Sequence, residues 1–123
     1  MTGRKLEGLT VDQLVQRFID IAFDQAKAEP YGDLVKMRSL YWEMDAVANE
    51  LRARPGDQRR ALVPLLRHGN IQVMMKAALS TLALEPKKAR LVLEAISLSG
   101  RQPQALEAGT SLAFLDDGTS KPT

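Results

Sequence analysis

The chain has 123 residues, which is enough for one domain of the usual size and too few for two. Hydrophobic residues make up 45% and charged residues 26%, a composition typical of a globular protein that buries a core. The absence of cysteine excludes disulfides, thiolate zinc sites and iron–sulfur clusters, and a single histidine excludes a His-Glu-x-x-His metal site.

The charge is small overall, a formal +2, but it is unevenly distributed along the chain. Residues 1–56 hold 8 basic and 9 acidic side chains, whereas residues 57–115 hold 8 basic and 4 acidic ones. This excess is weaker than the clustered basic surface of a nucleic-acid-binding protein. No apolar run approaches the roughly 20 residues that cross a bilayer, and no apolar signal segment follows Met1. We therefore expect a soluble, cytoplasmic protein that does not contact membranes.

Helical spacing of leucine and alanine runs through the whole chain, and β-branched residues never alternate with polar ones, so the predicted fold class is all-α. Thr10 and Gln13 have the spacing of a capping box, which predicts that the first helix starts there. This helix is expected to stop at Pro30. Gly32 can then take a left-handed conformation, and Asp33 can cap the next helix.

A second helix is expected over residues 34–53, where apolar positions recur at a spacing of three and four. With the first helix it should form an antiparallel hairpin. The positions predicted to face the core are Leu34, Met37, Leu40, Tyr41, Met44, Val47, Ala48 and Leu51.

The clearest break in the chain is the turn sequence Pro55-Gly56-Asp57. A short third helix is expected after it, over residues 58–67, with Ala61, Leu62, Leu65 and Leu66 inward. Pro64 lies inside this segment and lacks a backbone N–H donor, so the helix must kink or start late.

A fourth helix is expected over residues 71–84, between two turns. Gly69 is predicted to be left-handed and Asn70 to supply the N-cap. The helix is apolar on almost all sides, which indicates that other helices cover it. Its narrow polar stripe consists of Gln72, Lys76 and Ser80.

Two further helices are predicted from their proline starts. Pro86 opens the fifth, which Gly100 ends, and Pro103 opens the sixth. Residues 116–123 form a polar tail that is expected to be disordered. The face predicted to be buried on the sixth helix consists of Ala105, Leu106, Gly109, Leu112, Ala113 and Leu115.

The third and fourth helices and the fifth and sixth helices form matching pairs about 30 residues apart, a period typical of helical solenoids. The alternative, that any two leucine- and alanine-rich hairpins align this well, stays open. We expect an N-terminal arm over residues 1–9 and a single domain over residues 10–115, made of one long hairpin and two repeats. The pairs that match at this offset include Leu62 with Val92, Leu66 with Ile96 and Ala78 with Ala108.

The run from Leu62 to Asn70, a helix with Pro-Leu-Leu near its end and a capped second helix after it, resembles a HEAT-like repeat. Together with residues 51–54 and 85–89, the pattern over residues 10–115 is similar to a bacterial family called domain of unknown function two thousand and nineteen. The resemblance implies an α–α superhelix of the HEAT or armadillo kind. It implies no activity, because that family has none assigned to it.

The side chains that could carry chemistry are isolated from one another. His68 lies in a turn, and the acid nearest to it in sequence, Asp57, is a helix away, so it lacks an orienting carboxylate. Asp20 and Asp24 lie four residues apart without further metal ligands at matching spacing, which favours a solvated helix face. No glycine-rich phosphate loop occurs. We expect no catalytic residues, no cofactor and no metal, and therefore a protein that is not an enzyme.

Two hypotheses about function remain, and we favour the first. It is a non-enzymatic binding or scaffold module that holds a protein partner or a second copy of itself. The second is a helical-repeat domain that binds nucleic acid through its basic half, if those cations share one face. The residues expected at a partner surface are Trp42, Gln72, Met75, Lys76, Leu79 and Ser80, and those expected to contact an anion are Arg59, Arg60, Arg67, Lys87, Lys88 and Arg90.

Overall fold

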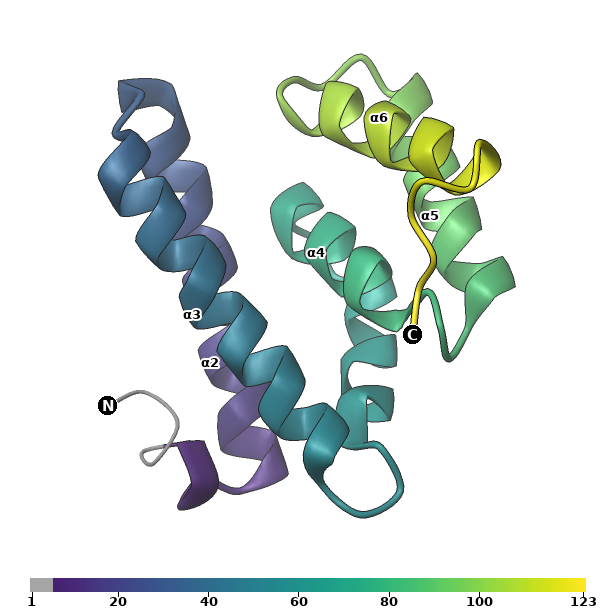
Figure 1. Cartoon of the computed structure of the whole chain (residues 1–123). Coiled ribbons are helices and arrows are strands. Elements are labelled where there is room, and N and C mark those ends of the chain that lie inside the picture. Colours follow the sequence, from purple (N-terminus) through teal and green to yellow (C-terminus); the bar gives the residue numbers. More distant parts are fainter. Residues whose placement is uncertain (1–5) are drawn as a thin grey trace. The chain divides into compact units, whose positions relative to one another are not determined.

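The computed structural model describes residues 6–123, and all the regular structure within that range is helical (Figure 1). The chain divides into two compact units, one that ends at Ala61 and one that begins at Leu62. The sequence predicts one domain over residues 10–115, and within that range the boundary between the two units lies between Ala61 and Leu62. Apolar spacing reports which face each helix buries, but not which helices pack into the same unit.

The first unit is built on an antiparallel hairpin of α2, Val11–Ala28, and α3, Leu34–Ala53 (Figure 1). The predicted capping box is confirmed: the Gln13 backbone N–H donates to Thr10 Oγ1 over 3.1 Å, and the Thr10 N–H donates to Gln13 Oε1 over 2.8 Å. These two bonds satisfy donors that have no partner inside the helix. The side chains of α2 that are buried are Leu14, Phe18, Ile21, Ala22, Gln25 and Ala28.

The connection between the two long helices agrees with the sequence prediction. A short 3-10 turn, η1, covers Glu29–Tyr31, and Gly32 is left-handed with φ of 64°. Asp33 caps α3 by accepting the Lys36 backbone N–H over 3.0 Å. α3 therefore begins and ends at the predicted residues.

The buried stripe of α3 is narrower than predicted. It consists of Leu40, Met44, Val47 and Leu51, all at most 6% exposed. Leu34 and Tyr41, which were assigned to this face, are exposed instead. The reason is geometric, because a single neighbouring helix, α2, covers only one side of a helix within this unit.

The expected N-terminal arm is partly integrated into the first unit. Residues 1–5 lie outside the described residues, but Leu6 is buried. Arg54, just past the end of α3, donates from Nη2 to the Leu6 carbonyl oxygen over 3.0 Å and pairs through Nε with Glu50 over 2.8 Å. One guanidinium thus ties the segment before α2 to the end of α3.

The segment η2, Gln58–Arg67, crosses the border between the units and is a 3-10 helix throughout, where a kinked or late-starting helix was predicted. Pro64 explains the departure, because it lacks the N–H that an α-helical bond at this position would need. Side chains three residues apart lie above one another in a 3-10 helix, and Leu62 and Leu65 are both buried.

The second unit adds α4, Ile71–Thr81, α5, Pro86–Leu98, and α6, Gln104–Asp116. Asn70 caps α4 as predicted, accepting the backbone N–H groups of Gln72 and Val73. Gly69 is not left-handed, contrary to the prediction. The 3-10 segment before it has no α-helical end for such a glycine to close, and His68 Nδ1 accepts the Asn70 N–H over 3.0 Å.

Two further boundaries differ from the sequence prediction. α4 ends three residues early, at Thr81, whose carbonyl oxygen accepts the N–H groups of both Leu84 and Glu85. Residues 116–120, expected within a disordered tail, have defined partners: the Ser120 N–H donates to the Phe114 carbonyl oxygen, and Asp116 pairs with Arg90 over 2.9 Å.

The buried face of α6 also differs from the predicted one. Ala105 is buried as expected, as are Gln104 and Ala108, which the prediction left out. Leu106 and Ala113, predicted to be inward, are exposed. This helix is apolar on two faces, and apolar spacing alone does not tell which of them a neighbour covers.

Polar side chains on α4 form the contact with α6 in the second unit. Gln104 Nε2 donates to Gln72 Oε1 over 3.0 Å, with both side chains buried. One turn further along α4, Lys76 Nζ donates to Glu107 Oε2 over 2.7 Å. Two of the three residues in the polar stripe of α4, Gln72 and Lys76, thus form internal contacts of the second unit.

Replacing Thr10 with Ala should lower the free energy of unfolding by about 1 kcal/mol, because the Gln13 N–H at the start of α2 loses its acceptor. Urea denaturation of the wild type and the variant measures this loss. Thr110→Ala, on an exposed position of α6, is the matched control and should not destabilise the protein. Equal stability of Thr10→Ala and wild type would contradict the role of the cap.

Replacing Gln72 or Gln104 singly with Leu should cost about 1–3 kcal/mol, because each change removes the hydrogen bond between the two buried amides but keeps one of the amides in place. The double variant should lose less than the sum of the two single losses, since both amides are then removed together. Urea denaturation of the four proteins forms a double-mutant cycle. Additive losses would show that the two amides do not depend on each other.

Candidate functional site

The residues of α4 that were predicted to bind a partner are mostly unavailable. Met75 is fully buried, Gln72 is buried against Gln104, and Lys76 is paired with Glu107. Leu79 and Ser80 are half-buried. Gln72, Met75 and Lys76 thus take part in the packing of the second unit, because a polar stripe on an apolar helix can also face a neighbouring helix.

Trp42, the remaining member of the predicted partner surface, is 60% exposed on α3. It meets the ring of Tyr41 edge to face, with the ring centroids 5.1 Å apart and the planes at 83°. Such edge-to-face contacts are a favoured arrangement of aromatic pairs. Trp42 thus lies on the exposed side of α3, away from the buried stripe.

The residues predicted to contact an anion differ in how exposed they are and in whether they already form ion pairs. Arg59 is buried and pairs with Asp57 over 2.6 Å, and Arg90 pairs with both Glu94 and Asp116. The other four are exposed, and none of them forms an ion pair within residues 6–123; they are Arg60, Arg67, Lys87 and Lys88. Arg59 and Arg60 belong to the first unit and the other four to the second, so neither unit holds all six.

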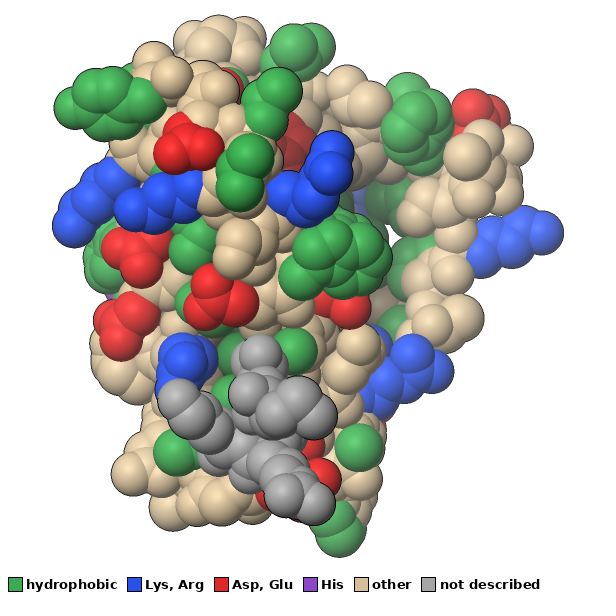
Figure 2. All heavy atoms as spheres, turned by 60° about the vertical axis from the view of Figure 1, so that its left-hand side comes forward, with side chains coloured by type: hydrophobic (Ala, Val, Ile, Leu, Met, Phe, Trp, Pro, Cys, Tyr) green, Lys and Arg blue, Asp and Glu red, His purple; other side chains and the backbone are tan. Residues whose placement is uncertain are grey.

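An exposed apolar surface lies on the first half of α3. We call it the α3 patch and define it as Leu34, Val35, Arg38, Ser39, Tyr41 and Trp42. Leu34 is 73% and Val35 82% exposed, well above the exposure of an ordinary core residue. The space-filling view in Figure 2 brings the side of α2 and α3 forward, and hydrophobic side chains are exposed there among basic and acidic ones.

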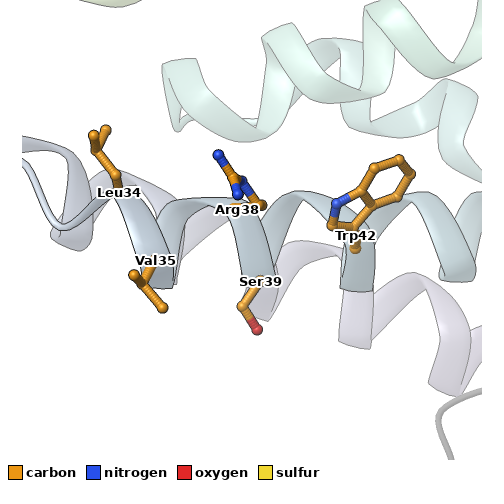
Figure 3. A pocket seen from close by; sticks show the side chains of 5 residues that line it. All are labelled: Leu34, Val35, Arg38, Ser39 and Trp42. Atoms are coloured by element: carbon orange, nitrogen blue, oxygen red, sulfur yellow. The ribbon is translucent and has the colours of Figure 1, made fainter.

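The α3 patch surrounds a shallow hollow of about 320 Å³, lined by five of its six members, all except Tyr41. In Figure 3, Leu34, Arg38 and Trp42 project from one side of α3, four residues apart, while Val35 and Ser39 project from the other side of the view. At about 100° per residue, Trp42 lies roughly 170° around the helix from the centre of the buried stripe. Trp42, Arg38 and Val35 thus lie on the side of α3 that faces away from α2, and the other members of the patch lie beside them.

Arg38 is the one charged residue lining this hollow. It is exposed and forms no ion pair with any other described residue. The nearest acid before it in sequence, Asp33, uses its carboxylate to cap α3. Arginine beside tryptophan and tyrosine is the composition of residues that dominate protein–protein binding energy.

The sequence prediction of a partner surface includes Trp42 but none of the other residues of the α3 patch. Leu34 and Tyr41 were assigned to the core because they continue a spacing of three and four. The two positions could have been recognised as exposed from their angle around the helix axis, which places them away from the centre of the buried stripe between Leu40 and Leu51. A hairpin of two helices covers a narrow stripe on each, so apolar side chains far from that stripe stay exposed.

Two of the side chains considered for catalysis or metal binding in the sequence have local hydrogen-bond partners. Within residues 6–123 no three His, Asp or Glu side chains are grouped closely enough to hold a metal ion. His68 Nδ1 accepts a hydrogen bond from the Asn70 backbone N–H, and Asp20 accepts a hydrogen bond from the side-chain Nε2 of Gln16 on the solvated side of α2. In the same range, no helix combines the length and the apolar character needed to span a bilayer.

The pKa of the Asp57 carboxyl lies below its usual value, chiefly because the Arg59 guanidinium donates two hydrogen bonds to it. A lowered pKa means that the folded state gains stability above about pH 4 and loses it as the pH falls through the folded pKa. Arg59→Met should therefore raise the pKa of Asp57, measured by NMR titration, and flatten the acid side of the stability profile. An unchanged pKa would contradict this assignment.

Comparison with known proteins agrees with this description of the chain. The protein RPA1889 from Rhodopseudomonas palustris CGA009 has a crystal structure similar to it, with a TM-score of 0.91 and 43% sequence identity over 96% of this chain and 98% of that chain. No curated protein matches the sequence. The family model described as Domain of unknown function (DUF2019) matches residues 12–116, which confirms the resemblance inferred from the sequence. The chain belongs to this family.

Proposed function

We propose that the chain is a non-enzymatic protein-binding module of HEAT-like type that holds its partner through the α3 patch. The observation that carries the proposal is the cluster of large apolar side chains exposed on one side of α3, with Arg38 among them. Monomeric proteins rarely leave a contiguous apolar patch uncovered unless it binds something. The burial of Trp42 alone can dominate the binding energy of such a surface.

The HEAT-like character is supported by the second unit. At the offset of 30 residues, Leu66 and Ile96 are both buried, and Ala78 and Ala108 are both fully buried. Two of the three named pairs thus have equivalent environments, whereas Leu62 is buried and Val92 is half-buried. The first repeat begins with the 3-10 helix η2, whereas the second repeat begins with the α-helix α5. Pro64 in η2 explains this difference.

Binding of a protein is favoured over binding of nucleic acid by the state of the cations. Arg59 and Arg90 already have carboxylate partners, and a phosphate would have to displace them. The four exposed cations predicted to contact an anion are divided between the two units, Arg60 in the first and the other three in the second. Nucleic-acid binding relies on several unpaired cations on one surface. The α3 patch offers one unpaired cation among apolar side chains instead, which suits the side chains of a protein.

Site-specific photo-crosslinking tests this proposal. A photoreactive amino acid at Val35, beside Trp42, should crosslink to a protein in nuclease-treated lysate of the native host, whereas the same group at Leu98, exposed on α5, should not. Adding Trp42→Ala should weaken the interaction by about 2 kcal/mol, about a 30-fold loss of affinity, and remove the crosslink. Equal crosslinking from both positions, or none from Val35, would contradict the proposal.

A further inference from the structure

We infer that the partner of the α3 patch is the α3 patch of a second copy of the chain, paired antiparallel about a two-fold axis at Trp42. This inference rests on the proposed function and names the partner of that same surface. It comes from the order of charges along the exposed side of α3. Arg38 lies four residues before Trp42, and Asp45 lies three residues after it.

Both charges are positioned to meet a partner. At about 100° per residue, Arg38 and Asp45 lie within roughly 60° of Trp42 on the same side of α3. Arg38 has no ion-pair partner among the described residues. Asp45 is half-buried, and its Oδ2 accepts a hydrogen bond from Asn49, which leaves Oδ1 for a second donor.

A two-fold axis at Trp42 makes this surface complementary to itself. Helical rise places Arg38 about 6 Å to one side of Trp42 and Asp45 about 4.5 Å to the other. In an antiparallel pair each Arg38 therefore faces the Asp45 of the other copy, within the reach of an arginine side chain. A parallel pair would put Arg38 beside Arg38 and Asp45 beside Asp45, which like-charge repulsion disfavours.

The same axis buries the apolar part of the surface. The two Trp42 rings meet at the centre, where buried aromatic residues contribute most to binding. Val35, seven residues before Trp42, lies opposite Asn49, seven residues after it, and both are exposed. The two ion pairs then flank an apolar centre and fix the register of the helices. One face used by both copies is the arrangement of an isologous dimer.

The single tryptophan of the chain makes the test specific to this surface. Static light scattering on eluting protein should give twice the mass of one chain at about 100 μM and approach the monomer mass on dilution. Tryptophan emission should shift to the red over the same dilution, because Trp42 becomes exposed when the copies separate. A monomer at every concentration, or a dimer whose emission does not change on dissociation, would overturn the inference.

Charge exchange gives the sharper test of the pairing. Arg38→Asp and Asp45→Arg should each weaken dimerisation by about tenfold or more, since each places like charges opposite one another twice. The double variant Arg38→Asp/Asp45→Arg restores both pairs and should recover the dimer. Leu98→Ala, an exposed apolar change on α5, is the control and should leave the dimer intact. Failure of the double variant to recover dimerisation would overturn the pairing, provided that circular dichroism shows it folded.

Failure of this inference is distinguishable from failure of the proposed function. A purified chain that stays monomeric but crosslinks from Val35 to a different protein overturns self-association and leaves the binding module standing. A monomeric chain with no Trp42-dependent crosslink to any protein overturns both.

Discussion

Most of what distinguishes this chain follows from one constraint on the first unit: it packs α2 along one side of α3. The side of α3 that contacts α2 is formed by the buried residues Leu40, Met44, Val47 and Leu51. The hairpin therefore cannot bury an apolar residue on the opposite side of α3. Trp42, Leu34 and Val35 lie there nonetheless. The stability of the hairpin does not require them, and the binding function we propose does.

In the second unit, by contrast, polar side chains pack against a neighbouring helix. Its helix α4 is apolar on almost every side, and the polar groups that interrupt it, Gln72 and Lys76, are placed against Gln104 and Glu107 of α6. A buried amide pair and a partly buried ion pair contribute orientation more than net stability, because their desolvation offsets much of their attraction. They fix which turn of α6 faces which turn of α4. These side chains are therefore committed to the fold.

Local signals in the sequence predicted the starts of α2, α3 and α4 well. The capping box at Thr10, the caps at Asp33 and Asn70 and the left-handed Gly32 depend on neighbouring residues, so the sequence contains all the information they need. The 3-10 form of η2, the division into two units and the buried face of α6 depend on which helices meet. That is tertiary information, and it also decided that Met75 is buried while Leu34 is exposed.

The contact of Arg54 with the Leu6 carbonyl oxygen affects how the hairpin can move. It joins the segment before α2 to the end of α3, so that these two ends of the hairpin cannot fray independently of each other. At the other end η1 carries an exposed Tyr31, and none of its described residues is buried. Local unfolding of the first unit should therefore begin at η1 and advance into the first turn of α3. Amide hydrogen exchange would then be fastest where the α3 patch starts, and a bound partner would slow it from that end.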